Sequence, residues 1–398
     1  MEQATEEETV FKSQDAEVYR IPALIYDTDN KKLLAFAEKR RTADDASTEE
    51  LVMKTGTVSR DEPTQEVKIT WSEVSTVVKK ADLQGYRPMN PCPIYDKTSK
   101  TLYLFFIRVE DNVSEYWQIS WSCNKTRLCY MTTKDAGKSW SEMTDLTDGL
   151  AEIKKWSTFA VGPGHGLQTE SGRLIVPVHA YYSCCSSCCF CYFSCFCCFC
   201  YFRCFNPEEV PQYALALYKD QSDTNWKCGK MLLNKSGECQ MAEFVDEQHK
   251  SFIYCNARTK GGFREEAVSE NNGEDFSNLI GDPKLVETAE GCQGSVVSFP
   301  AQSEGANGDS QNKWLLYTHP NDKFERKEIA VYLNESPQDR NAWSKPWIIY
   351  NGPSAYSDLA YIGDGWFACL MECGKKEYTE QIALKIFNYS DVKQGTGE

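Results

Sequence analysis

The sequence predicts an all-β protein built from repeated four-stranded blades, and three observations lead to that prediction. Short apolar runs, rich in β-branched and aromatic residues, recur along the chain and are bounded by Gly, Asn, Asp, Ser or Pro. Amphipathic helical windows are scarce, and residues 150–156 form one short candidate. A turn motif occurs in more than one copy, which favours repeated blades over a simple sandwich or barrel.

The apolar runs supply the expected strands in chain order. Each run is only a few residues long, which suits a strand better than a helix. Eight runs stand out: KLLAFAE (32–38), TLYLFFI (101–107), RLIVPV (173–178), SFIYCNA (251–257), KWLLYTH (313–319), EIAVYLN (328–334), WFACLME (366–372) and QIALKIF (381–387).

The repeated turn is clearest at residues 133–140, which read TKDAGKSW. Its Asp bonds nearby backbone N–H groups, and the Gly two residues later supplies a positive φ, so the two form a tight turn. The Trp that follows is expected to pack beneath the turn. Residues 269–276, SENNGEDF, are a degenerate second copy, and residues 220–226 carry a weaker trace.

Length and charge limit the function classes. A chain of 398 residues exceeds one small core, and we expect a single repetitive β domain over residues 1–398. The net charge is −15 and no basic cluster occurs, so nucleic acid is not an expected partner. The N-terminal MEQATEEETVF lacks a basic region followed by an apolar one, so we expect neither a secretory signal nor secretion.

The cysteines fall into two groups. Ten of the nineteen lie between Cys184 and Cys204, in a segment with almost no charged residues. We interpret residues 184–205 as a low-complexity insertion within the domain, with metal binding, palmitoylation and membrane contact as the functional alternatives. The other nine are scattered singly from Cys92 to Cys373, and we expect reduced, mostly buried thiols.

Three arginines occupy similar positions at strand ends. Arg20 stands in YRIP, Arg258 ends IYCNAR, and Arg326 lies in the loop before EIAVYLN. Taken singly, each fits an ordinary surface arginine. If the three converge, they form a strong carboxylate receptor, because guanidinium is permanently charged and binds carboxylate in bidentate fashion.

Several acids and one tyrosine are further candidates. Arg40 is followed by the turn-like pair that ends at Asp45, and Glu238 stands in GECQ. Tyr356 stands in AYSDL, and Glu372 ends an apolar run. Read in isolation, such residues are more often solvated charges or packed rings than catalysts.

Together the motifs resemble those of the vertebrate sialidases of glycoside hydrolase family 33. The resemblance runs from about Val10 to Phe387 and is interrupted mainly by the cysteine-rich segment. The spacing from Arg40 to Asp45 to Leu51 is most similar to that of the membrane-associated, ganglioside-preferring branch. The motifs occur in family order: YRIPAL, LLAFAEKR, MNPCPIYD, RLCYMTT, WSTFAVGPGHG, LIVPV, GCQGSVVSFP, WLLYTHP, VYLN and AYSDL.

The resemblance implies a six-bladed β-propeller with its site at the central mouth. It implies an exo-α-sialidase that removes terminal sialic acid with retention of configuration, and it requires no metal or cofactor. The expected partners are sialylated glycolipids or glycoproteins, with peripheral contact to a membrane. The expected location is the cytoplasm or the surface of the plasma or endosomal membrane.

The resemblance also assigns roles to residues. The substrate carboxylate goes to Arg20, Arg258 and Arg326, and Glu372 holds Arg20 in place. Tyr356 is the implied nucleophile, with Glu238 beside it as base, and Asp45 is the implied general acid/base. The implied lining of the sugar pocket is Arg40, Met89, Asn90, Glu115 and Tyr181.

One departure from the family pattern falls in the pocket. The family usually reads Tyr-x-Tyr after the LIVPV strand, whereas this chain reads His179-Ala180-Tyr181. We expect His179 to contact the glycerol or N-acyl arm of the sugar in an altered way. The alternative function is a propeller that binds sialoglycans without cleaving them, and the trio of Tyr356, Glu238 and Asp45 favours the enzyme over that alternative.

Overall fold

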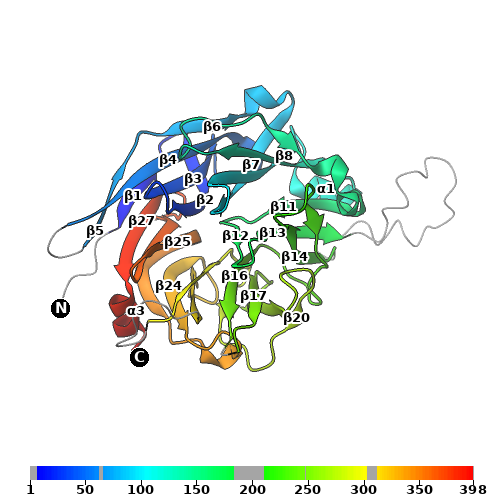
Figure 1. Cartoon of the computed structure of the whole chain (residues 1–398). Helices are drawn as coiled ribbons and strands as arrows, with labels where there is room; N and C mark the ends of the chain where they lie inside the picture. The colour runs from blue at the N-terminus through cyan, green and yellow to red at the C-terminus, as the bar shows by residue number, and fades with distance from the viewer. Residues whose placement is uncertain (1–6, 62–65, 183–209, 247, 303–311, 398) are drawn as a thin grey trace.

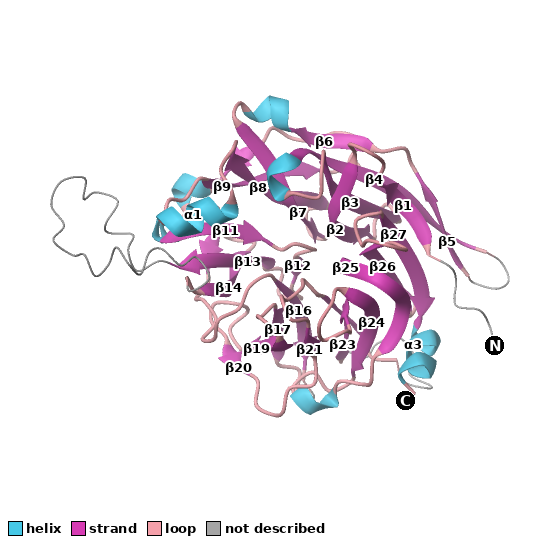
Figure 2. Ribbon diagram, turned by 180° about the vertical axis from the view of Figure 1, so that it is seen from behind, coloured by secondary structure: helices cyan, strands magenta, loops and turns pink. Residues whose placement is uncertain are grey.

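The strands of this chain are arranged around a central axis as a β-propeller, which confirms the predicted all-β fold (Figures 1 and 2). The computed structural model describes residues 7–61, 66–182, 210–246, 248–302 and 312–397. All eight apolar runs form strands. They are β3 (Lys32–Arg40), β8 (Thr101–Glu110), β13 (Leu174–Tyr182), β17 (Ser251–Ala257), β23 (Lys313–Pro320), β24 (Lys327–Asn334), β26 (Trp366–Cys373) and β27 (Gln381–Asn388).

Three antiparallel sheets form the first half of the chain. In the first, β2 (Val18–Asp27), β3, β4 (Thr48–Arg60) and β5 (Val67–Trp71) follow one another, and β6 (Ser75–Lys79) pairs with β4. The second has the order β10 (Thr144–Asp145), β9 (Thr126–Thr133), β8 and β7 (Tyr86–Asp96). The third has the order β11 (Trp156–Val161), β13, β14 (Gln212–Lys219) and β15 (Lys227–Cys228), with β12 (Leu167–Gln168) beside β13.

The second half continues the same pattern. The strands β16 (Cys239–Val245), β17, β19 (Glu265–Ser269) and β20 (Ser277–Asn278) form one sheet, and β18 (Gly262–Phe263) pairs with β21 (Val286–Glu287). A seven-stranded sheet has the order β1 (Glu8–Lys12), β27, β26, β25 (Trp347–Gly363), β24, β23 and β22 (Ser295–Pro300).

The two ends of the chain close the ring. Strand β1 pairs antiparallel with β27, with Glu8 opposite Leu384. Behind this pairing, Leu24 and Leu33 of the first sheet pack with Leu370 of the last, and all three are fully buried. Burial of apolar surface between neighbouring sheets is therefore what holds the first and last sheets together.

The predicted Asp turn is present at residues 133–140. The Asp135 carboxylate accepts hydrogen bonds from the Ser139 N–H at 2.9 Å and from the Thr133 hydroxyl at 2.8 Å. These bonds, with one from the Ser139 hydroxyl, lower the pKa of Asp135 to about 2. Gly137 has a φ of +84°, and Trp140 packs edge-on against Phe36.

The two weaker copies differ in how closely they follow this turn. In the second, the Asn271 side chain accepts from the Asp275 N–H at 3.1 Å, and Phe276 is buried in place of Trp. In the third trace, Trp226 is buried, but Asp220 forms an ion pair with Arg173 at 2.6 Å. The third trace therefore has the buried aromatic residue of the turn motif, but its Asp forms an ion pair.

Helices are few, as the sequence predicts, but their positions differ from the expected one. The candidate at residues 150–156 is a 3₁₀ helix, Ala151–Lys155, because strand β11 begins directly after it at Trp156. Among the described residues, α-helices occur at α1 (Glu115–Trp121) and α3 (Tyr389–Thr396). Further 3₁₀ turns lie at Asp45–Ser47, Lys80–Leu83, Thr147–Gly149 and Arg340–Ala342.

The cysteines outside the insertion behave as predicted. All nine are free, and seven of them are buried. The cysteine-rich insertion at 184–205 lies outside the described residues, between β13 and β14. None of the helices described is long and apolar enough to cross a membrane.

Candidate active site

Three arginines from distant parts of the chain surround one tyrosine. The guanidinium carbon of Arg20, in β2, lies 5.7 Å from the centre of the Tyr356 ring, and that of Arg326 lies 5.5 Å from it. A terminal nitrogen of Arg258, directly after β17, lies 3.3 Å from the Tyr356 hydroxyl. The structure therefore brings together the three arginines that the sequence predicts to converge.

The Tyr356 hydroxyl is paired with a carboxylate. It donates to Glu238 Oε1 at 2.5 Å, while Glu238 Oε2 accepts from Arg258 at 2.8 Å. Burial raises the pKa of Tyr356 well above its usual range, and the Glu238 charge adds to the rise. Burial opposes ionisation of Glu238, but the charge of Arg258 and the hydrogen bonds from Tyr356 and Arg258 act against it, and the pKa of Glu238 is lowered overall. The pair thus consists of a neutral phenol beside a carboxylate.

Glu372 fixes the position of Arg20 and of the tyrosine backbone. It is fully buried at the end of β26, and its Oε1 accepts from Arg20 Nε at 2.6 Å and from the Ile21 N–H at 2.8 Å. Its Oε2 accepts from the Tyr356 N–H at 3.3 Å. Ile21 has a φ of +60°, an uncommon conformation for a β-branched residue, and the Glu372 carboxylate bonds its N–H.

The other two arginines rest on the loop that follows β21. Arg258 donates to the Glu290 carbonyl at 2.7 Å, and Arg326 donates to the Gly291 carbonyl at 2.9 Å. A guanidinium carries five N–H donors, so these contacts orient each arginine and leave donors for a ligand. The loop itself is bonded to Glu287, which accepts from the Thr288 and Cys292 N–H groups at 2.9 and 3.0 Å.

Tyr378 is a site residue that sequence reasoning missed. Its ring lies 5.2 Å from the guanidinium of Arg20 and 6.0 Å from that of Arg326. Cation–π contact on two sides holds both arginines in place. Tyr378 stands in the polar loop between β26 and β27, where nothing in the surrounding sequence distinguishes it.

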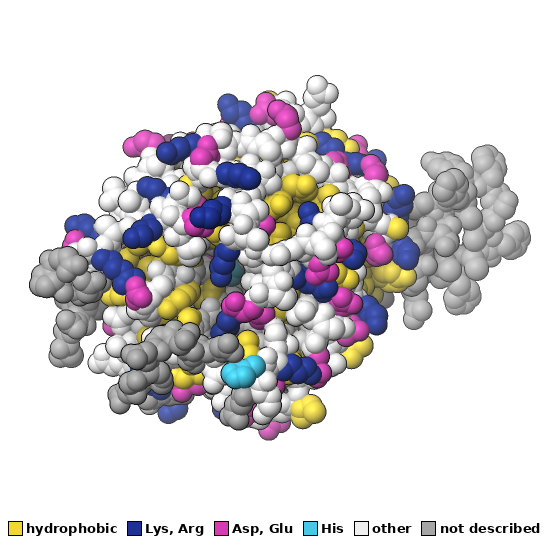
Figure 3. Space-filling view, viewed as in Figure 1, with side chains coloured by type: hydrophobic (Ala, Val, Ile, Leu, Met, Phe, Trp, Pro, Cys, Tyr) yellow, Lys and Arg dark blue, Asp and Glu magenta, His cyan; other side chains and the backbone are white. Residues whose placement is uncertain are grey.

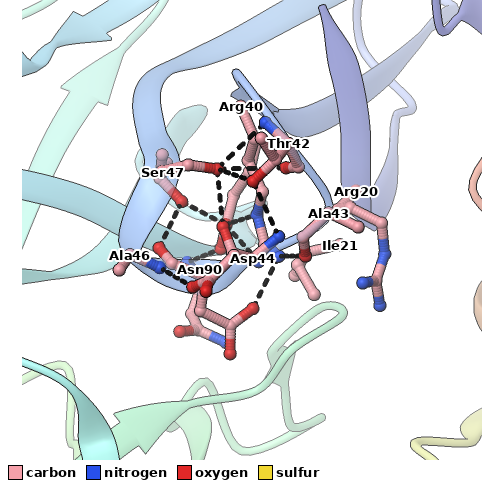
Figure 4. A network of polar contacts seen from close by, with 12 residues as sticks. Arg20, Ile21, Arg40, Thr42, Ala43, Asp44, Ala46, Ser47 and Asn90 are labelled. Carbon is pink, nitrogen blue, oxygen red and sulfur yellow. Dashed lines mark hydrogen bonds and ion pairs between the residues drawn. The ribbon is translucent and has the colours of Figure 1, made fainter. Parts of the chain in front are cut away.

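Arg40 and Asp45 form a second group, at the end of β3. Arg40 is buried, and it contacts Glu38 at 2.6 Å and Asp45 at 2.5 Å. Asp45 lies on a 3₁₀ turn and its side chain is 63% exposed. Figure 4 shows loop 42–47 folded beside Arg40. Arg40 thus links the exposed carboxylate of Asp45 to the buried carboxylate of Glu38.

Glu38 joins this group to the next sheet. It is fully buried, it accepts from Arg40 Nε at 2.8 Å, and it accepts from the Asn90 N–H at 2.7 Å. Asn90 has a φ of +56°, at an irregularity in the pairing of β7 with β8. Its neighbour Met89 is buried in the core between the second and third sheets. Glu38 lies in the LLAFAEKR motif, but its sequence context alone indicated no role for it.

Glu115 and Tyr181 form the opposite wall of the site. The Tyr181 hydroxyl, at the end of β13, bonds the Glu115 carboxyl at the first residue of α1. The side chain of Glu115 reaches solvent within a concave cleft. Its pKa is raised, first because surrounding protein displaces water, and also because Asp45 and Glu238 are negatively charged nearby. Asp45 and Glu115 line the same cleft, and Glu238 is near enough to influence the charge of Glu115.

His179 lies in β13, two residues before Tyr181. It is buried, its Nδ1 has no partner among the described residues, and burial lowers its pKa, so the ring is neutral at neutral pH. The charge of Glu238 raises this pKa and that of Arg258 lowers it, but His179 forms no described bond to either residue. The sequence expectation of an altered contact to the sugar stays a prediction.

A cleft of about 370 Å³ lies between the Asp45 turn and the start of α1. In the space-filling view the molecule is hollowed at its centre, and Lys and Arg side chains lie beside the hollow (Figure 3). The lining residues of the cleft are Ala43, Asp44, Asp45, Ala46, Arg87, Ser114, Glu115 and Tyr116. Among the residues that the structure describes, no group of three or more His, Cys, Asp or Glu side chains is placed to hold a metal ion.

The sequence of this chain is similar to a known repeat family and to several sialidases. A family described as "BNR repeat-like domain" matches residues 26–369. Sialidase-3 of Rattus norvegicus is 38% identical, over 96% of this chain and 94% of the relative. Sialidase-2 of Mus musculus is 40% identical, over 96% and 95% of the two chains, and Sialidase-4 of Mus musculus is 35% identical, over 94% and 91%.

Comparison with solved structures supports the fold. The intramolecular trans-sialidase from Ruminococcus gnavus superimposes with a TM-score of 0.70 at 16% identity, over 97% of this chain and 98% of that one. A Trypanosoma rangeli sialidase, solved as a covalent intermediate with 2,3-difluorosialic acid, has a TM-score of 0.68 at 15% identity, over 98% of this chain and 60% of that one.

Proposed function

This chain belongs to the vertebrate sialidase family, and from that premise we propose that it is a retaining exo-α-sialidase acting on gangliosides and other sialoglycoconjugates. The observation that carries the proposal is the contact between Tyr356, Glu238 and Arg258. The guanidinium groups of Arg20 and Arg326 lie over the ring of the same tyrosine. A binding module needs the arginines but has no use for a buried phenol that donates to a carboxylate.

We further infer that the propeller has six blades. The first four sheets in chain order each contribute one. The seven-stranded sheet contains β25, a strand of 17 residues whose first part pairs with β24 and whose second part pairs with β26. Dividing that sheet at β25 gives one blade of β22 to β25 and another of β25, β26, β27 and β1.

Recognition is proposed to begin at the arginines. Sialic acid carries a carboxylate on its reacting carbon, and three guanidinium groups around Tyr356 offer bidentate, charge-assisted hydrogen bonds to it. Binding there sets the anomeric carbon near the Tyr356 hydroxyl. A neutral phenol suits this role, because a carboxylate nucleophile would be repelled by the carboxylate of the substrate.

Bond formation is proposed to depend on Glu238. Tyrosine is a weak nucleophile at its free pKa, and it needs a base that removes its proton. Glu238 is ionised and already accepts that proton at 2.5 Å. As the glycosidic bond breaks, the phenol oxygen attacks the anomeric carbon and its proton passes to Glu238, which leaves a tyrosyl glycoside. Enzymes with a tyrosine nucleophile are a known exception to the two-carboxylate pattern of glycosidases.

Asp45 is proposed to serve the leaving group and then water. Its protonated form gives a proton to the departing oxygen, and its ionised form later takes one from the water that cleaves the tyrosyl glycoside. As that bond breaks, Glu238 returns its proton to the Tyr356 oxygen. Its exposed position on a short turn suits a group that must reach both partners. Arg40 contacts it at 2.5 Å and keeps it at the edge of the cleft.

The proposed function is tested by assaying release of free sialic acid from ganglioside micelles and from a soluble sialoglycoprotein. The enzyme hypothesis expects release from gangliosides, with slower release from the glycoprotein. If the purified protein binds sialosides without releasing sialic acid from either substrate, the non-catalytic binding module is the correct description.

We also propose peripheral contact with a membrane that carries gangliosides. Three aromatic side chains near the cleft are exposed to solvent: Trp117 by 38%, Trp121 by 60% and Tyr182 by 40%. Amphipathic rings of this kind favour the boundary between lipid and water. Trp121→Ala is expected to slow release from gangliosides in zwitterionic vesicles while release from soluble sialyllactose stays unchanged. Equal rates for both proteins on the vesicles would contradict the contact.

A further inference from the structure

We infer that Tyr116 forms the binding site for the sugar to which the sialic acid is attached, and so contributes to the choice of substrate. The inference rests on the proposed function, because it needs Asp45 to act as the acid. Tyr116 is the second residue of α1, it lines the 370 Å³ cleft, and it is 66% exposed. None of the proposed catalytic steps uses it.

The position of the acid indicates which part of the substrate fills this cleft. A general acid must lie within hydrogen-bond reach of the glycosidic oxygen. The carboxylate of the sialic acid is held on the other side of that oxygen, by the arginines around Tyr356. The leaving sugar must therefore extend past Asp45, away from the arginines. Asp45 lines the cleft bounded by residues 43–46 and 114–116, whereas Tyr356 and the three arginines around it are not among the residues that line it.

The side chain of Tyr116 suits a sugar ring. An aromatic ring carries a negative face, which attracts the weakly positive C–H groups on the flat side of a hexose. Binding sites for small molecules combine such apolar surfaces with a few polar groups that fix orientation. Here Asp44 and Glu115 stand on either side of the cleft and offer acceptors to sugar hydroxyls.

The backbone of the segment that carries Tyr116 is held by several hydrogen bonds. Arg87 is 2% exposed and donates to the Glu110 carbonyl at 2.9 Å and to the Val113 carbonyl at 2.7 Å. The Ser114 hydroxyl caps α1 by accepting from the Trp117 N–H at 3.0 Å. A pre-formed platform loses little conformational freedom when the sugar binds.

The test compares two substrates that share the sialic acid and differ in the leaving group. α-Sialosyl fluoride has no sugar to leave, whereas sialyllactose has one. For Tyr116→Ala, kcat/KM on sialyllactose is expected to fall roughly three- to tenfold, the range of one aromatic contact, while kcat/KM on the fluoride stays within about twofold. Tyr116→Phe keeps the ring and is expected to retain most of the activity on sialyllactose.

Trp121→Ala is the matched control, because Trp121 is an exposed aromatic on the same helix and does not line the cleft. It is expected to cleave both soluble substrates like the wild type. Equal losses on both substrates in Tyr116→Ala would mean that Tyr116 shapes the sialic acid pocket, and no loss on either would mean that no sugar rests on it. Both results overturn the inference. A wild-type protein that is inactive on the fluoride contradicts the proposed function itself.

Discussion

The phenol of Tyr356 and the carboxylate of Glu238 share one hydrogen bond, and Arg258 controls how that proton is shared. In the free protein Arg258 contacts both groups and lowers the pKa of Glu238. A bound substrate carboxylate would neutralise part of the Arg258 charge and so raise the basicity of Glu238. Substrate binding would then prepare the base for its step. In the proposed mechanism, the same arginine would serve both recognition and proton transfer.

Arg326 offers the cleanest test of carboxylate recognition, because it contacts the backbone of Gly291 and the ring of Tyr356 but has no described ion pair. Arg326→Lys is expected to weaken a sialic acid inhibitor by roughly tenfold or more, since an ammonium lacks the planar fork. The loss is expected to be much smaller for the amide of the same inhibitor, measured by calorimetry. Equal losses for the acid and the amide would show that Arg326 does not touch the carboxylate.

The loop after β21 supports two of the three arginines, and Glu287 supports the loop. Glu287 is buried, and it contacts Arg264 at 2.5 Å and His319 at 2.9 Å. Arg264 in turn donates to the Cys292 carbonyl at 2.5 Å. This buried network has no contact with the substrate in the proposed mechanism, so Glu287 is a positioning residue.

Glu287→Gln is expected to destabilise the fold by about 3 kcal/mol, because it leaves the buried Arg264 charge without its partner. It is also expected to weaken the sialic acid inhibitor, since the Glu290 and Gly291 carbonyls that orient the arginines would shift. Glu290→Gln is the control in the same loop, because the Glu290 side chain is exposed and only its carbonyl bonds Arg258. Similar melting temperatures and affinities for the two variants would contradict this account of the loop.

The Asp turn at residues 133–140 makes a smaller, pH-dependent contribution. The pKa of Asp135 falls from 3.8 to about 2 on folding. A lowered pKa in the folded state stabilises above the unfolded pKa, and that stability is lost as the pH falls from about 4 towards 2. Asp135→Ala is expected to cost about 1 kcal/mol at pH 7 and less at pH 2.5 by chemical denaturation, with Lys134→Ala as the exposed control. A cost that does not change with pH would contradict the ionic origin of this contribution.

The sequence predicted strands better than the contacts between them. All eight apolar runs are strands because their length, composition and flanking turn residues are local properties. Helix α1 was missed because it is short and its only buried apolar residue is Ile119, the other apolar residues being exposed aromatics. The 150–156 candidate is held to a 3₁₀ turn by the strand that follows. Tyr378 and Glu287 were missed because their importance arises only where distant loops meet.

The whole molecule is a closed ring, and the two strands that flank the insertion in the sequence pair with each other. Strand β13 ends at Tyr182 and β14 begins at Gln212, and the two strands pair with Tyr181 opposite Gln212. Antiparallel neighbours of this kind are commonly joined by a loop of a few residues. The two strands pair without a register shift from Leu174 opposite Lys219 to Tyr181 opposite Gln212, so we expect a short connection to preserve their register.

Replacing residues 184–204 with a short Gly/Ser linker is expected to leave a soluble, folded propeller with an unchanged melting temperature. Circular dichroism and size-exclusion chromatography would measure this, with the parent protein as control. Aggregation or global unfolding of the shortened protein, beside a well-behaved parent, would show that the segment belongs to the core.

Tyr356 is proposed to become covalently bound to sialic acid during turnover, and labelling with 2,3-difluorosialic acid tests this step. The fluorine at C3 slows hydrolysis of the glycosyl-enzyme, so the intermediate accumulates and intact mass spectrometry detects it. One added 3-fluorosialosyl group is expected, located on Tyr356 by peptide mapping and absent from a folded Tyr356→Phe protein. A label on a carboxylate side chain, or Tyr356→Phe that still becomes labelled and releases sialic acid, would contradict it.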